Sequence, residues 1–215
     1  MSAKDPTLDT ETSEAEVPAH GATRWRRFGL TMLGSTAVAA GLIALTAQGV
    51  LAAQFSLSGQ PFTVTATRLE GTGFEQFATL DSMIENSPNA GDTGGQLVLV
   101  VSAIKDAKLS NLCQSLSLGG TFLKITAGGG GNPVTAHTLV VDSDEISGDA
   151  SFTNIEIGND ASTLTQVPGV QGFPGVFSQQ ADTVVITNLR QNNFATTAAS
   201  FHLTGLHISF SSDGC

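Results

Sequence analysis

The sequence predicts an all-β domain over residues 54–215, and three observations support this prediction. Apolar and polar residues alternate in several stretches, as in Phe62–Thr67, where every second side chain is apolar. Charged residues make up only 13% of the chain, which has 24 Gly residues and no Tyr. Loops rich in Gly and Pro, such as "AGGGGNP", separate the alternating stretches. This composition favours strands joined by turns over charged surface helices.

Seven stretches are the expected strands. The run Leu97–Val101 is apolar throughout, which is typical of a strand that is buried on both faces. In Ala199–Phe210 the apolar positions change phase at Gly205, so we expect a bulge or bend there. The full set of expected strands is 62–67, 97–101, 122–126, 138–142, 151–157, 183–187 and 199–210.

A loose recurrence links these strands. An alternating stretch is repeatedly followed by a Leu or Ile step and a second alternating stretch, and the copies begin about 35 to 45 residues apart. Such spacing is typical of a solenoid-like or roll-like stacked sheet, in which each unit buries a face that it cannot bury alone. Alternating strands also produce this pattern by chance, so a two-sheet β-sandwich is the alternative.

The segment before residue 54 has a different character. Residues 1–24 are polar, acidic and poor in aliphatic side chains, so they cannot offset the entropy of ordering, and we expect a disordered tail. We expect a single hydrophobic helix at residues 25–53. Residues 28–53 carry no charge, and as a helix they would be roughly 39 Å long, more than the ~30 Å hydrocarbon core of a bilayer.

Positive charge predicts the orientation of this helix. Arg24, Arg26 and Arg27 flank its N-terminal end, and no positive residue follows before Arg68. The positive-inside bias places the tail in the cytoplasm and residues 54–215 on the other side of the membrane. Small residues near Ala53 would also suit a signal peptidase. A retained signal anchor and a cleaved signal peptide both stay open, so the domain is expected to be membrane-attached or secreted.

The two cysteines agree with an extracytoplasmic domain. Cys113 and Cys215 are an even pair, and in an oxidising compartment such a pair predicts a disulfide. Closing a loop of ~100 residues would stabilise the fold by up to ~4.7 kcal/mol in the chain-entropy model. The alternative is two unpaired buried thiols.

Charge and motif content exclude several classes of function. The formal net charge is −10, so there is no basic surface to bind nucleic acid. No Cys-x-x-Cys or Cys/His spacing predicts zinc or thiol redox chemistry. The segment "AGGGGNP" is not followed by the Gly-Lys-Ser/Thr of a phosphate-binding loop, so no cofactor is expected.

Two groups of residues are weak candidates for ligand binding. Asp142, Asp144 and Asp149 could hold a hard cation such as calcium, although solvated carboxylates on an exposed turn explain them as well. In "GVQGFPGVF" the apolar side chains could form a lip for a lipid or a membrane surface, although a loop packed beneath the core is the simpler interpretation. The residues of this lip are Val170, Phe173, Val176 and Phe177.

A search for a catalytic site gives no clear nucleophile. The Gly-x-Ser-x-Gly turn of the common α/β hydrolases is absent from the sequence. The histidines available as bases in the exported part are His137, His202 and His207. His202 and His207 alternate with apolar neighbours, so we expect exposed strand histidines rather than a base or metal ligands.

Several segments resemble a known group of proteins. "FTVTATRLEGTGFEQF", "SAIKDAKLSNLCQSL", "ASFTNIEIGNDASTLT" and "QQADTVVITNLRQNNFATTAASFHLTGL", after an Arg-Trp-Arg-Arg-Phe start, are similar to an uncharacterised family of actinobacterial envelope proteins. Some of its members carry a cholesterol esterase label. The resemblance implies an extracytoplasmic protein that works beside a small multi-pass membrane protein, and it supplies no catalytic residues.

Two functional hypotheses follow. The first and favoured one is a non-enzymatic exported cell-envelope protein, whose β domain binds a lipid or polymer or assembles on the cell surface. The second is a divergent lipid esterase, which rests on the family label and on the apolar lip.

Overall fold

The computed structural model describes residues 57–91 and 94–215, so the expected tail, the hydrophobic segment and Arg24, Arg26 and Arg27 lie outside the described residues. Within these two ranges, no helix is long and apolar enough to cross a membrane. The described part of the chain consists mainly of β-strands, which confirms the predicted all-β class.

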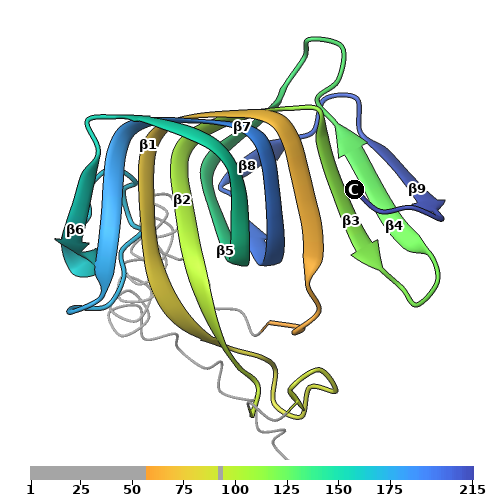
Figure 1. Ribbon diagram of the computed structural model, residues 1–215, viewed down its shortest axis with the longest axis horizontal. Helices are drawn as coiled ribbons and strands as arrows, with labels where there is room; N and C mark the ends of the chain where they lie inside the picture. The colour runs from red at the N-terminus through yellow and green to blue at the C-terminus, as the bar shows by residue number, and fades with distance from the viewer. Residues whose placement is uncertain (1–56, 92–93) are drawn as a thin grey trace, which may run out of the picture. The chain divides into compact units, whose positions relative to one another are not determined.

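The nine strands of the described ranges form one hydrogen-bonded sheet (Figure 1). Four of them are long, namely β1 (Phe62–Ser82), β2 (Gln96–Ser110), β5 (Val134–Thr153) and β7 (Phe177–Thr197). The short strands are β3 (Leu112–Ser117), β4 (Phe122–Ala127), β6 (Glu156–Asp160), β8 (Ser200–His202) and β9 (His207–Ser211). A short 3-10 helix, Ala161–Thr163, follows β6.

The four long strands close into a ring of antiparallel neighbours. β1 pairs with β2, β2 with β5, β5 with β7, and β7 pairs again with β1. A solenoid stacks each unit only on its neighbours in sequence, whereas here the first long strand pairs with the last, so the solenoid-like form of the expected sheet is wrong. The two-sheet alternative is also corrected, because every strand in the described ranges belongs to the same sheet.

The expected strands all overlap observed ones, but the observed strands are longer. The alternating pattern in 62–67 covers only the start of β1, which continues to Ser82. Strand β3 was not expected. Gly205 has a φ angle of 68° and lies between β8 and β9, so the expected bend at this residue is confirmed.

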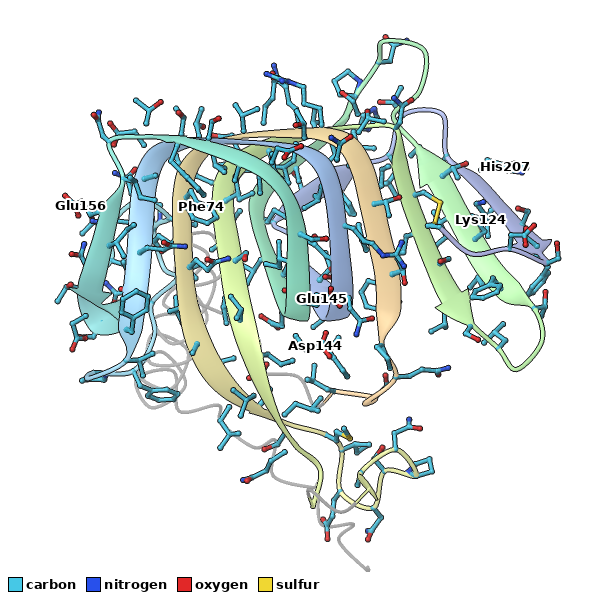
Figure 2. All side chains as sticks on the ribbon, viewed as in Figure 1. Phe74, Lys124, Asp144, Glu145, Glu156 and His207 are labelled. Atoms are coloured by element: carbon cyan, nitrogen blue, oxygen red, sulfur yellow. A yellow bond between two sulfur atoms is a disulfide. The ribbon has the colours of Figure 1, made fainter. Side chains whose placement is uncertain are left out.

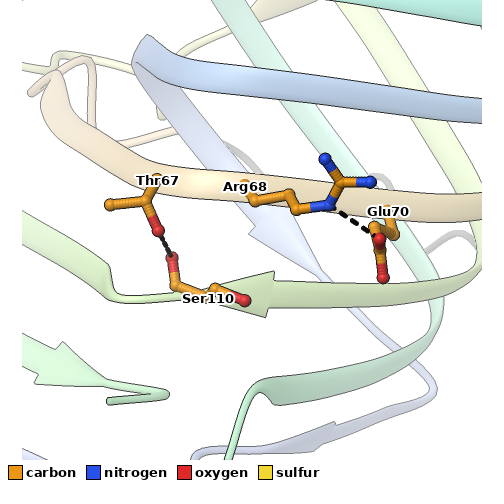
Figure 3. Close-up of polar contacts among 4 residues, drawn as sticks. All are labelled: Thr67, Arg68, Glu70 and Ser110. Atoms are coloured by element: carbon orange, nitrogen blue, oxygen red, sulfur yellow. Dashed lines mark hydrogen bonds and ion pairs between the residues drawn. The ribbon is translucent and has the colours of Figure 1, made fainter. Parts of the chain in front are cut away.

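A row of residues that includes left-handed backbone conformations runs across the neighbouring strands of the ring, and the strands bend at this row. Asn111, between β2 and β3, and Asn188, in β7, have left-handed φ angles of 51° and 55°. The Thr67 hydroxyl on β1 accepts a hydrogen bond from Asn111 Nδ2 at 3.0 Å. It also donates to the Ser110 carbonyl at 3.1 Å, as Figure 3 shows. On β5 the row ends at Gly148, where a Cβ would lie 2.8 Å from a backbone oxygen of β7.

A second row of bends lies further along the strands. Thr138 in β5, Gly73 in β1 and Asn154 after β5 have φ angles of 48°, 64° and 52°. A Cβ on Gly73 would approach the side chain of Lys105 in β2 to 2.9 Å, so the two strands are close at this point. Asn154 Nδ2 donates to Asp182 Oδ2 in β7 at 2.6 Å.

We call the stretches between the two rows the central segments. In Figure 1 the long strands turn over at the top of the view. The side chains of Arg68 and Glu70 form an ion pair on the outer surface of one central segment, with Nε and Oε1 2.7 Å apart (Figure 3). The central segments are 68–72 of β1, 106–110 of β2, 134–137 and 149–153 of β5, and 183–187 of β7.

Apolar side chains inside the ring form the main core. Its members come from all four long strands, whose inward positions are apolar both between the two rows of bends and beyond them. The core includes Val64, Leu69, Phe74, Ile104, Leu109, Val134, Leu139, Val141, Val184 and Leu189.

Strands β3, β4 and β9 extend the sheet beyond β1, and we call them the three-stranded extension. Cys113 on β3 forms a disulfide with Cys215, which confirms the predicted bridge. The Cys215 backbone nitrogen also donates to Ser115 Oγ at 2.9 Å, and the Cys215 carbonyl accepts from Arg190 Nη1 at 3.1 Å. The C-terminus is thereby held against both the extension and β7.

The disulfide is expected to contribute a large part of the stability. It spans 102 residues, so its removal increases the entropy of the unfolded chain. We expect the double variant Cys113→Ser/Cys215→Ser to lose about 2–4 kcal/mol in its free energy of unfolding, measured by urea titration. An unchanged midpoint and slope would contradict this expectation.

Candidate functional site

A cavity of about 260 Å³ lies inside the ring. Its wall is built by the four long strands together with β3 and β8. The rings of Phe74 and Phe152 pack with their centroids 5.3 Å apart, and Figure 2 shows Phe74 on β1. The apolar part of the wall comprises Val64, Leu69, Phe74, Ile104, Leu109, Leu112, Leu139, Val141, Ile146, Ala150, Phe152, Ile186 and Phe201.

The polar part of the wall is uncharged. Among the described residues, none that lines this cavity is Asp, Glu, Lys, Arg or His. Each polar side chain lies outside the central segments, whereas Leu69, Phe152 and Ile186 lie within them. The cavity is therefore amphipathic, with an apolar region beneath the central segments. Its polar residues are Gln76, Ser102, Gln114, Ser147, Gln191, Asn193 and Thr196.

Two amides in the wall differ in their hydrogen bonding. Gln76 Nε2 donates to Ser102 Oγ at 2.9 Å, and Gln76 Oε1 accepts from Gln179 Nε2 at 2.6 Å. Asn193 is only 1% exposed, and its buried Oδ1 has no hydrogen-bond partner. Leaving such an acceptor unpaired costs about 1–3 kcal/mol, so this oxygen is an unused binding group.

The apolar lining continues outside the cavity. Gln114 on β3 lines the cavity, and in the sheet register it lies opposite Ile125 on β4, which lies opposite Ile208 on β9. Residues directly opposite each other in a sheet share a face. Ile208 and Phe210 are 55% and 73% exposed on this face. An apolar surface therefore leads from the cavity wall over the three-stranded extension.

The outer face of the ring carries a second apolar cluster, covered by residues 161–176, which we call the covering segment. Leu164, Val167 and Val170 of this segment pack on Phe77 and Val101 of the sheet, with other small apolar residues. The covering segment shields this cluster from solvent, and the apolar contacts hold the segment against the strands.

Glu75 of β1 holds the covering segment against the sheet by a hydrogen bond. Its side chain is fully buried, and Oε1 accepts a hydrogen bond from the Val167 backbone nitrogen at 2.7 Å. Oε2 has no partner. Burial raises the pKa of Glu75 from 4.5 to about 7, against the lowering effect of the backbone hydrogen bonds from Val167 and Gln166.

The four residues of the expected apolar lip separate into two pairs. Val170 is buried and Val176 packs against the second cluster, as expected for a loop beneath a core. Phe173 and Phe177 are 65% and 64% exposed, so they are the part of this segment that presents apolar surface to solvent.

The three aspartates proposed for calcium have separate partners. Asp144 Oδ1 accepts from Asn192 and Asp149 Oδ2 accepts from Asn188, at 2.8 and 3.0 Å. Burial, together with the nearby Asp81 carboxylate, raises the pKa of Asp142 to about 6. In the described ranges, no group of three His, Cys, Asp or Glu residues is placed to hold a metal ion.

The histidines lie on the surface. His202 and His207 are exposed, in agreement with the alternation in the sequence. His137 Nδ1 lies 2.7 Å from Asp106 Oδ1, with both side chains about half exposed. Among residues 57–91 and 94–215, no serine hydroxyl is hydrogen-bonded to a histidine ring.

The fold and the cavity define a domain built mainly of β-strands around an amphipathic cavity. Residues 58–215 match the model of a family of unknown function, DUF6230, and the chain belongs to this family. No curated protein and no solved structure matches the chain.

Sequence reasoning did not find the residues of the cavity. Gln191 and Asn193 occupy inward positions of β7 in continuation of Leu189, and this alternation was the available signal. It could not be used, because the expected strand ended at Thr187 and the inward face of the next residues depends on the bend at Asn188.

The pKa of Glu75 predicts a pH dependence of stability. Between pH 4.5 and about 7 the unfolded chain has an ionised Glu75 and the folded protein a protonated one, so stability falls as the pH rises through this range. Between pH 4.5 and about 7, the free energy of unfolding of the wild type should fall by up to about 3 kcal/mol relative to that of Glu75→Gln, which is about 1.4 kcal/mol per pH unit.

Chemical denaturation of both proteins at several pH values measures this difference. The exposed Glu145→Gln variant is the control for the loss of one negative charge. Parallel stability profiles of wild type and Glu75→Gln between pH 4.5 and 7 would show that burial of the carboxyl has no such effect.

Proposed function

We propose that the protein is a non-enzymatic, extracytoplasmic binding domain for an apolar molecule of the cell envelope, and that this molecule is a lipid. The observation that carries the proposal is the amphipathic cavity inside the ring. Ligand sites are typically concave and mainly apolar, with a few polar groups that orient the ligand.

The lining favours a lipid over an envelope polymer. A polysaccharide or peptide polymer presents many polar groups, and each of them would need a partner in a wall made largely of Leu, Ile, Val and Phe. At about 260 Å³ the cavity exceeds the ~150 Å³ of an apolar cavity that binds benzene. A longer chain would continue over Ile125 and Ile208 of the extension.

The proposed location rests on the disulfide and on the apolar segment of the sequence. Disulfides persist in oxidising compartments, which supports an extracytoplasmic domain. Residues 25–53 would attach this domain to the membrane or direct its secretion. The family resemblance in the sequence supports an actinobacterial envelope protein that has a small multi-pass membrane protein as a partner.

Blocking the cavity tests the proposed function. Ile146 lines the cavity and is only partly buried, so the Ile146→Trp variant should fill the space with little strain. We expect its affinity for a neutral fluorescent lipid analogue to fall at least about tenfold, or ~1.4 kcal/mol.

The control is Ile84→Trp, which adds the same ring at a position that is 59% exposed and lies outside the cavity. It should bind like the wild type. Equal binding by all three proteins, or no binding of neutral lipids by the wild type, would contradict the proposal. Mass spectrometry of the protein purified from its own envelope would identify a copurified ligand.

A further inference from the structure

Resting on the proposed function, we infer that the cavity selects an uncharged amphiphile with a hydrogen-bond donor, such as a long-chain alcohol, and that Asn193 recognises the donor. The proposal rests on the unpaired oxygen of Asn193, the charge of the wall and the distribution of its polar groups.

The side chain of Asn193 has the properties of a recognition group. It is 1% exposed, it lines the cavity, and its Oδ1 lacks a partner. In the register of the sheet Asn193 lies opposite Phe62 and Ser143, which hold β7 between β1 and β5. A hydroxyl or amide N–H of a ligand would donate to this oxygen and remove the penalty of an unpaired buried acceptor.

The charge of the wall determines the class of head group. Each side chain that lines the cavity, within the described ranges, is uncharged. A carboxylate or phosphate would therefore be desolvated without a cation to pair with, and this is costly. A neutral head group avoids that cost.

The distribution of polarity determines the orientation of the ligand. Leu69, Phe152 and Ile186 lie in the central segments, between the two rows of bends. Gln191 and Asn193 lie beyond the bend at Asn188. The hydrocarbon chain therefore lies beneath the central segments, and the donor lies against β7 beyond this bend.

The test compares three probes of equal chain length by displacement of a neutral fluorescent lipid analogue from the full chain, stripped of lipid. Hexadecanol carries a donor, hexadecyl methyl ether has none, and palmitate is anionic at pH 8. We expect the wild type to bind the alcohol about tenfold more tightly than the ether, and palmitate less tightly than the alcohol.

The Asn193→Leu variant keeps the branched shape and the number of heavy atoms of the side chain and removes the acceptor. It should bind alcohol and ether equally. The matched control is Asn192→Leu, because Asn192 carries the same amide on the opposite face of β7, where it donates to Asp144. This control should keep the preference for the alcohol.

The outcomes separate this inference from the proposed function. If the wild type binds alcohol and ether with equal affinity, or prefers palmitate, the inference fails while lipid binding stands. If the wild type binds none of the three probes, the proposed function itself fails. The comparison of probes on the wild type decides the matter even if Asn193→Leu does not fold.

Discussion

The pairing of β1 with β7 is the constraint on which the rest of the structure depends. It joins the first and the last long strand, and it converts a row of antiparallel strands into a ring with an inside and an outside. Strands of 15 to 21 residues can close in this way only if they bend, because a straight strand of this length would extend past its partners. The two rows of bends meet this requirement.

The bends also explain the distribution of chemistry in the cavity. Apolar residues fill the inward positions between the rows, where the strands pack against one another. Polar residues such as Gln76 and Gln191 occupy inward positions beyond the rows, where the ring leaves space. The bends thus separate an apolar region of the interior, between the rows, from a region beyond them where apolar residues such as Val141 and polar residues such as Gln191 both face inward. On the outside, Glu75 ties the covering segment to the ring at the cost of a buried carboxyl.

The sequence predicted the class of fold because alternation and turn residues are local signals. It located part of every long strand, the bend at Gly205 and the bridge between Cys113 and Cys215. It did not predict the ring, because the contact between β1 and β7 joins segments far apart in sequence and leaves no local pattern. The bends at Thr138 and Asn188 reverse the inward face of their strands, so alternation could not be followed through them.

The same reasoning explains the result for the candidate site. The aspartates and the apolar lip were found because they are conspicuous in the sequence. Yet Asp144 and Asp149 lie on the surface, Asp142 is partly buried with a raised pKa, and the lip lies in or beside the covering segment. Asn193 is inconspicuous in the sequence, and only the closed ring reveals it as a buried acceptor without a partner.

Methyl NMR during a titration with hexadecanol tests most directly whether the closed ring holds an apolar ligand inside. The account predicts that the methyl signals of Leu69, Ile104 and Ile186 in the cavity wall shift, while those of Ile84 and Ile157 on the surface do not. Shifts confined to surface methyl groups, with the cavity signals unchanged, would contradict it.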